Sequence, residues 1–204
     1  IKDLDNYVSR LEDFIKCKFM EYLKDIVKKI TLWHGVKAVN VFEGVDKELI
    51  NELCRLLRQG FKIICVGTEL RSDDRVGLYI CDKMLSLNFK DVIKCSYGLE
   101  NCIEDLINLE KALIIDGLYT DLPPGTIVLA NPDELSDDIL VSTHSIPHRL
   151  VIKLIRSLGG LKEVKILGIR VKSLDIGTLL SPEVKRVADE LVNKLLSVLG
   201  KSDH

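Results

Sequence analysis

The strongest constraint on the fold is an alternation of strand-like and helix-like segments between residues 61 and 199. Short apolar runs typical of buried strands alternate with longer segments whose apolar residues recur every three or four positions, as in amphipathic helices. Parallel strands need crossover connections, usually helices, so this order predicts a mainly parallel sheet covered by helices on both faces. We therefore predict an α/β fold, a three-layer α/β/α arrangement with a mainly parallel five-stranded sheet. The predicted strands are residues 61–66, 91–96, 112–116, 126–130 and 163–171, and the predicted helices are 74–87, 102–109, 147–158 and 182–199.

The first 60 residues have a different pattern. Apolar residues from Leu4 to Ile30 recur in steps of three and four, which predicts one helix of about seven turns. A second helical pattern runs from Leu49 to Leu57 and ends near Gly60. We predict a helical N-terminal extension over residues 1–60 and an α/β domain over residues 61–204. The long apolar stripe would either dock on the protein's own body or bind a partner.

The composition indicates a globular protein and excludes several classes of partner. Of the 204 residues, 47% are hydrophobic and 29% are charged, which is enough apolar material for a sizeable core. The net charge is −2 and no Lys/Arg run exceeds two residues, so we predict no nucleic-acid binding. No apolar run approaches the roughly 18 residues of a membrane span, and the acidic first residues do not resemble a secretory signal. We predict a cytoplasmic protein with no membrane partner.

The chain has six cysteines, and none of them form a CxxC pair. They lie within predicted helices and strands, where cysteine is usually a small buried apolar residue. We therefore predict buried free thiols in a reducing compartment, rather than a disulfide framework or a zinc site. The six are Cys17, Cys54, Cys65, Cys81, Cys95 and Cys102.

Polar residues that can bind a cation lie in three loops that we expect at the same edge of the sheet. In an open α/β sheet the site gathers outside the carboxyl ends of the strands. The residues are Asp73 and Asp74 in loop 67–77, Asp116 after the apolar run 112–115, and His144 and His148 in loop 141–148.

Each of these side chains has a purely structural explanation when taken alone. Asp73 or Asp74 could cap the following helix, and Asp116 could accept hydrogen bonds from the next turn. A loop histidine is often a bystander. Two carboxylates and one imidazole at one sheet edge, however, are a suitable ligand set for a divalent metal ion.

The order of these residues resembles a known family. Gly67-Thr68, Asp73-Asp74 and Gly77 are similar to the signature loop GxGNxxxxDDGxG of the nickel-iron hydrogenase maturation endopeptidases. The resemblance extends over residues 61–199 and implies removal of the C-terminal extension of a nickel-iron hydrogenase large subunit precursor. The further matching runs, in the family's order, are Leu113–Gly117, Pro123–Ile127, Ser142–His144, Leu167–Ile169 and Leu180–Val184.

The resemblance also implies a ligand set. Asp74, Asp116 and His144 match the family's metal-contacting positions, which engage nickel already installed in the large subunit. The expected ion is thus a divalent metal, nickel carried by the substrate, either catalytic or only a sign of substrate readiness. We predict Asp74, Asp116 and His144 as catalytic and metal-binding residues, with Asp73 as a catalytic helper. His148 is expected to be dispensable, and the oligomeric state is not predicted.

Four residues depart from the family pattern, which leaves a second function open. Thr68 replaces the asparagine, and Cys65, Ser72 and Arg75 replace glycines at positions that can require φ > 0 or close backbone approach. The alternative is a noncatalytic metal-sensing or assembly module that binds a hydrogenase-related partner. A nucleotide-binding domain is disfavoured, because the loop lacks GxGxxG and has two acids where phosphates would lie.

Overall fold

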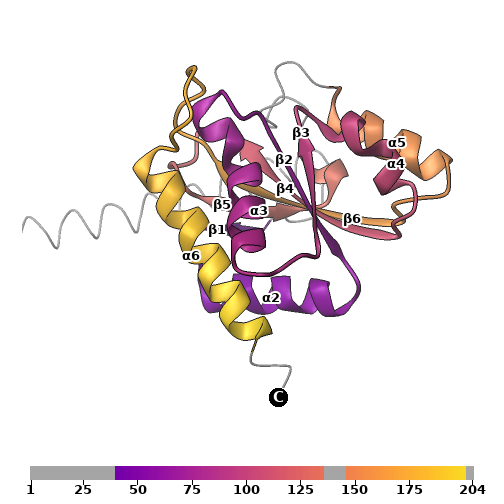
Figure 1. Cartoon of the computed structure of the whole chain (residues 1–204), viewed down its shortest axis with the longest axis horizontal. Coiled ribbons are helices and arrows are strands. Elements are labelled where there is room, and N and C mark those ends of the chain that lie inside the picture. Colours follow the sequence, from indigo (N-terminus) through magenta and orange to yellow (C-terminus); the bar gives the residue numbers. More distant parts are fainter. Residues whose placement is uncertain (1–39, 136–145, 201–204) are drawn as a thin grey trace, which may run out of the picture. The chain divides into compact units, whose positions relative to one another are not determined.

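A computed structural model describes residues 40–135 and 146–200. Within these residues a six-stranded sheet has the order β1-β5-β6-β4-β2-β3 (Figure 1). The pairs β2–β3, β2–β4 and β4–β6 are parallel, whereas β5 is antiparallel to both β6 and β1. The predicted mainly parallel α/β sheet is confirmed, with one strand more than predicted. The strands are β1 Asn40–Phe42, β2 Lys62–Gly67, β3 Val92–Ser96, β4 Lys111–Leu118, β5 Ile127–Ala130 and β6 Glu163–Arg170.

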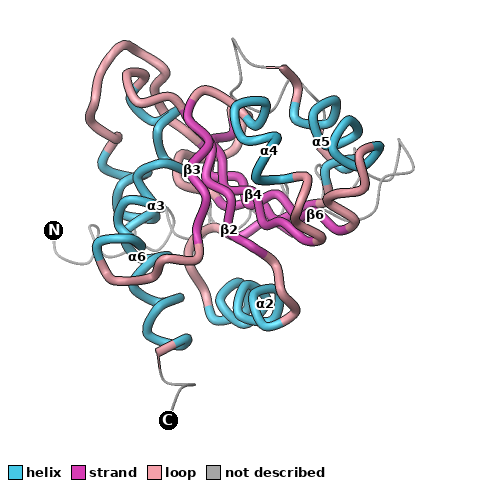
Figure 2. The backbone as a smooth tube through the Cα atoms, turned by 45° about the vertical axis from the view of Figure 1, so that its right-hand side comes forward, coloured by secondary structure: helices cyan, strands magenta, loops and turns pink. Residues whose placement is uncertain are grey.

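Helices cover both faces of the sheet. Figures 1 and 2 show α2, α3 and α6 on one side and α4 and α5 on the other, which gives the predicted three layers. Their bounds are α2 Lys47–Arg58, α3 Val76–Ser86, α4 Ile103–Leu106, α5 His148–Ser157 and α6 Pro182–Leu199. Three short 3₁₀ turns occur in the described residues: η1 Ser72–Arg75, η2 Leu99–Cys102 and η3 Pro132–Glu134.

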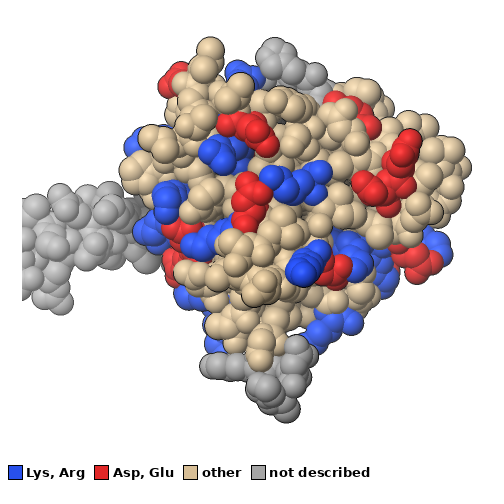
Figure 3. Space-filling model, viewed as in Figure 1, with Lys and Arg blue, Asp and Glu red and all other residues tan. Residues whose placement is uncertain are grey.

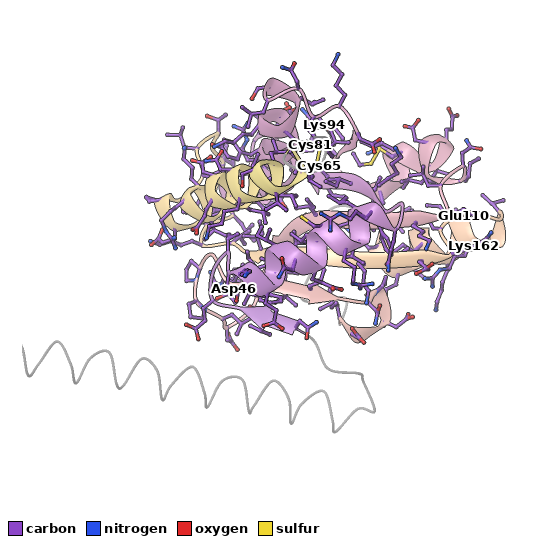
Figure 4. The ribbon with its side chains drawn as sticks, turned by 90° about the horizontal axis from the view of Figure 1, so that it is seen from below. Asp46, Cys65, Cys81, Lys94, Glu110 and Lys162 are labelled. Atoms are coloured by element: carbon purple, nitrogen blue, oxygen red, sulfur yellow. A yellow bond between two sulfur atoms is a disulfide. The ribbon has the colours of Figure 1, made fainter. Side chains whose placement is uncertain are left out.

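The central strand β4 shows why the sheet forms here. Every residue of β4 after Lys111 is buried, as expected for a parallel strand between two helical layers. A large apolar cluster fills the space between one sheet face and helices α2, α3 and α6. Its members include Leu49 and Leu53 of α2 and Leu191 of α6. The first turn of α2 is capped by Asp46, whose carboxylate accepts a hydrogen bond from the Leu49 amide at 2.8 Å (Figure 4).

The predicted domain boundary between residues 60 and 61 lies inside this compact unit, which begins at Asn40. Strand β1 pairs with β5, and α2 contributes buried leucines to the same core as α3 and α6. Residues 40–60 are therefore part of the α/β unit, and they include a strand that was not predicted. The long helix predicted from Leu4 to Ile30 lies outside the described residues.

The prediction of free thiols is wrong for four of the six cysteines. Cys65 of β2 is disulfide-bonded to Cys81 of α3, and Figure 4 shows them side by side. Cys95 of β3 is bonded to Cys102 of η2. Cys54 is free and buried, as predicted, and Cys17 lies outside the described residues. The packing of each strand against the following helix or turn creates these pairs, which sequence spacing does not reveal.

The surface agrees with the balanced composition. On the face drawn in Figure 3, basic and acidic side chains are interspersed and form no extended patch of one sign. Across residues 40–135 and 146–200, every helix is too short or too polar to cross a bilayer.

Candidate active site

Asp116 lies near the carboxyl end of β4 and is 2% exposed. Its Oδ1 accepts a hydrogen bond from the Gly117 amide at 2.7 Å. Its Oδ2 lies 2.9 Å from Nε2 of His148, the first residue of α5. The Asp116 carboxylate is almost fully shielded from solvent. It is contacted by its own strand, β4, and by helix α5, which covers one face of the sheet.

Asp74 lies in η1, directly after the loop that follows β2, and is 4% exposed. Burial raises the pKa of the Asp74 carboxyl to about 6; a hydrogen bond with the Thr68 side chain opposes this rise, and the negative charge of Asp116 adds to it. The two carboxylates are therefore close enough to interact. Since the folded pKa is above the unfolded one, ionised Asp74 destabilises the fold at neutral pH, and this cost disappears as the pH falls.

Asp73, the neighbour of Asp74, has a different environment. Its fully buried carboxylate accepts hydrogen bonds from the backbone amides of Lys172, Ser173 and Ser181 and from the Ser181 hydroxyl, at 2.6–3.0 Å. These bonds anchor the segment 172–181, which connects β6 to α6. Asp73 is thus a structural anchor, and its contacts give no support to the predicted role of catalytic helper.

Two motif glycines explain how Asp74 reaches the end of β4. A Cβ on Gly77 would lie 2.1 Å from the carbonyl oxygen of Val66 and 2.6 Å from that of Ile115, so α3 packs directly on β2 and β4. A Cβ on Gly67 would lie 2.3 Å from the Asp74 carbonyl oxygen. Ser72, which replaces a motif glycine, has φ of 40°, as the glycine pattern predicted.

The structure describes two of the three predicted ligands. Asp74 and Asp116 lie near one another at the predicted sheet edge, whereas His144 lies outside the described residues and its role stays a prediction. Within residues 40–135 and 146–200, no group of three or more His, Cys, Asp or Glu side chains is close enough to hold a metal ion. A cation bound by Asp74 and Asp116 would need further ligands from elsewhere.

The contact of His148 with Asp116 is a feature of the site that the sequence did not predict. His148 was expected to be dispensable, yet it is 1% exposed and contacts Asp116. A signal was available: His148 occupies the same helix face as the buried Val151, Ile152 and Ile155, at the spacing of an apolar stripe. An imidazole at an apolar position of this helix is expected to be buried, as His148 is.

Beside the site, two loops are held together and expose apolar side chains. The Ser72 amide donates to the Gly177 carbonyl at 2.8 Å, and the Gly177 amide donates to the Leu70 carbonyl at 3.0 Å. Leu70, Ile176 and Leu179 are 58%, 94% and 82% exposed. We call these three residues the apolar rim. Its backbone is fixed by the same contacts that position Asp73 and Asp74.

Comparisons with known proteins agree with this architecture. A family model described as hydrogenase maturation protease matches residues 90–198, more than half of the chain. A Methanocaldococcus jannaschii protein, whose name assigns it to the hydrogenase maturation proteases, is 30% identical over 149 residues, 67% of this chain and 86% of its own length. This chain belongs to the hydrogenase maturation protease family.

Other relatives are consistent with that membership. The hydrogenase 3 maturation protease of Escherichia coli K12 is 28% identical over 112 residues, 53% of this chain and 70% of its own. The [NiFe] hydrogenase maturation protease HybD of Thermococcus kodakarensis is 26% identical, with a TM-score of 0.54 over 68% of this chain and 97% of that one. The solution structure of the endopeptidase HycI from Escherichia coli shares the fold, with a TM-score of 0.56, 22% identity and coverage of 66% and 87%.

Membership identifies the chain as a peptide hydrolase whose family processes the large subunit of hydrogenases. The buried acids, Asp74 and Asp116, belong to the runs that carried the family resemblance in the sequence. No contact in the described residues favours the alternative of a noncatalytic assembly module.

Proposed function

We propose that this protease removes the C-terminal extension of a nickel-iron hydrogenase large subunit precursor after nickel insertion, and that Asp74 and Asp116 contact the nickel. The observation that carries the proposal is the pair of buried, electrostatically interacting carboxylates at the carboxyl edge of the sheet. Two buried acids without a cation between them repel each other, and a divalent ion removes that cost.

The chemistry of the two acids fits a cation delivered by the substrate. Carboxylate oxygens bind hard and borderline divalent ions, and a bound ion can polarise a peptide carbonyl and lower the pKa of a water molecule. Oδ1 of Asp116 accepts a hydrogen bond from the Gly117 amide and Oδ2 faces His148, and each carboxylate oxygen has a second lone pair that can bind a cation. Asp74, whose pKa is raised to about 6, would ionise fully on contact with the metal.

The apolar rim supports the same proposal from the side of the substrate. A protease must hold the polypeptide on either side of the bond that it cleaves. Exposed Leu70, Ile176 and Leu179 lie on the two loops that also carry Asp74 and the groups bonded to Asp73. In this proposal the rim contacts the precursor next to its C-terminal extension.

A cytoplasmic location stays a prediction, and the two disulfides weaken the cysteine argument that supported it.

The test is incubation of the protein with nickel-loaded and nickel-free precursor, followed by intact mass measurement. Wild type should shorten only the loaded precursor. Asp116→Asn keeps the shape of the side chain but removes its charge, so cleavage should fall by at least about 100-fold while the melting temperature changes little. Asp105→Asn, on the exposed surface of α4, is the matched control and should cleave like wild type.

Three results would count against the proposal. Equal cleavage of loaded and nickel-free precursor would show that cleavage does not depend on nickel. Full activity of Asp116→Asn would show that the charge of Asp116 is not required. Binding of loaded precursor by wild type without any shortening, across a range of metals and temperatures, would return the alternative of an assembly module.

A further inference from the structure

His148 combines complete burial with an unusual lack of hydrogen bonds. Its side chain is 0% exposed, and that of Asp116 is 3% exposed. The separation of 2.9 Å between Nε2 and Oδ2 is a hydrogen-bond distance, but the ring is not aligned for a good bond, and neither ring nitrogen has another partner among the described residues. Burying an unpaired polar group destabilises the folded protein, so an imidazole on this helix face needs an explanation beyond packing.

Asp116 supplies the explanation. Its Oδ1 is held by the Gly117 amide at 2.7 Å, and Oδ2 faces His148. A small rotation of the ring would direct the Nε2 hydrogen at Oδ2 and convert the contact into an aligned hydrogen bond. Catalytic hydrogen bonds are often poorly aligned before substrate binds and tighten afterwards. The carboxylate would then be held on both oxygens, from its own strand and from α5.

Such a contact matters because a ligating carboxylate must present a lone pair in a fixed direction. Groups that hydrogen-bond to a metal ligand orient it, and their loss typically lowers metal affinity or activity about 10- to 100-fold. The imidazole of His148 is a side-chain donor within hydrogen-bond distance of Asp116 Oδ2, at 2.9 Å from Nε2. The His148 imidazole is fully buried, so it would act on the substrate through Asp116 and not by direct contact.

We infer that His148 is a positioning residue for Asp116: its Nε2–H donates to Oδ2 and fixes the orientation in which the carboxylate meets the substrate's nickel. This inference rests on the proposed function for the last clause only. The contact itself is a property of the protein without substrate.

The kinetic test compares His148→Leu with His148→Gln. Leucine fills the space without a donor, whereas glutamine places an amide N–H near the position of Nε2. His148→Leu should lower kcat about 10- to 100-fold with KM changed less than about twofold, and His148→Gln should recover a large part of the loss. Ile152→Ala, on the same buried face of α5, is the control: it should lower Tm but keep kcat well below its melting temperature.

An independent readout is the ¹⁵N spectrum of the imidazole in the full-length wild-type protein, assigned by comparison with His148→Gln. The expected result is a ring with its hydrogen on Nε2, protected from exchange and shifted in Asp116→Asn. A ring with its hydrogen on Nδ1, or a signal that Asp116→Asn leaves unchanged, would overturn the inference.

The two readouts keep the failures apart. If wild type cleaves the loaded precursor and His148→Leu matches it in kcat, the positioning role is wrong while the proposed function stands. If Ile152→Ala loses as much kcat as His148→Leu, the effect is structural and the inference fails. If wild type never cleaves, the proposed function fails, and the imidazole spectrum still decides whether His148 positions Asp116.

Discussion

The carboxylate of Asp73 receives two hydrogen bonds from Ser181, one from its backbone amide at 2.6 Å and one from its hydroxyl at 2.8 Å. Ser181 is the N-cap residue of α6, but its side chain does not accept a bond from the helix, because the hydroxyl is directed at Asp73 instead. One buried acid in the β2–α3 connection thereby fixes the start of the last helix and the loop before it.

We predict that Asp73→Asn destabilises the fold and loosens segment 172–181. An amide cannot accept four hydrogen bonds as a carboxylate does, and bonds to charged groups contribute about 1.5–3 kcal/mol each. The free energy of unfolding should fall by about 2–4 kcal/mol, measured by denaturant titration. Ser181→Ala, which removes only the hydroxyl bond, should cost about 1 kcal/mol. Unchanged hydrogen exchange at the amides of Lys172, Ser173 and Ser181 in Asp73→Asn would contradict this account.

Gly77→Ala should be among the most damaging single-methyl additions in the protein. The new Cβ would lie 2.1 Å from the Val66 carbonyl oxygen, so α3 would have to move off the sheet. We expect a loss of about 3 kcal/mol or more, read as a fall in Tm. Gly44→Ala is the matched control, since a Cβ there meets nothing within 4 Å, and it should change stability by less than about 0.5 kcal/mol. A Tm for Gly77→Ala equal to that control would refute the close packing.

Asp189 should make stability depend on pH in the acid range. Burial alone would raise the pKa of its carboxyl, but hydrogen bonds from Lys185, Lys83 and Tyr79 outweigh this and hold the pKa well below its usual range. A depressed folded pKa stabilises the fold above the unfolded value of about 3.9 and loses that contribution as the pH falls. Asp189→Asn should therefore lower Tm at pH 7 and differ less from wild type below pH 4. A constant difference between the two proteins across that range would argue against the ionic contribution.

Ile176→Ser combined with Leu179→Ser tests the apolar rim. We expect these side chains to bind the precursor equally in the ground state and in the transition state. The double variant should therefore have a KM about tenfold or more higher than wild type, with kcat and Tm near wild type. Leu154→Ser with Leu158→Ser is the control, because those leucines of α5 and its C-cap are 48% and 58% exposed but lie outside the rim. Equal KM values for the two double variants would show that general surface hydrophobicity, and not the rim, is measured.

The disulfides can be checked directly by mass spectrometry. Digestion without reductant should yield linked peptides for Cys65 with Cys81 and for Cys95 with Cys102, while Cys54 takes up an alkylating agent in denaturant. Closing a loop of 16 residues restricts the unfolded chain by about 3 kcal/mol, so reduction should lower Tm. Complete alkylation of the four paired cysteines before reduction would restore the original prediction of free thiols.

Local sequence was sufficient for most of the secondary structure. Helix α6 has the predicted bounds, Pro182 to Leu199, because proline at the first position and an apolar stripe are signals within one segment. The strands of the parallel sheet were predicted from short strand-like segments between helical ones. The motif likewise placed Asp74 and Asp116 at one edge, since the carboxyl ends of parallel strands must meet there.

What the sequence could not determine depends on segments that meet only in the folded protein. Strand β1 has three residues, too few for a periodic signal, and exists because β5 offers it an edge. Asp73 and Asp74 are adjacent and chemically identical, yet one anchors a loop about 100 residues away and the other interacts with Asp116. The contact between His148 and Asp116 could not be predicted either, because it joins the end of β4 to the start of α5, two segments that are separate in the sequence. Sequence patterns record periodicity and local caps, whereas the direction of a buried side chain is decided by the tertiary packing around it.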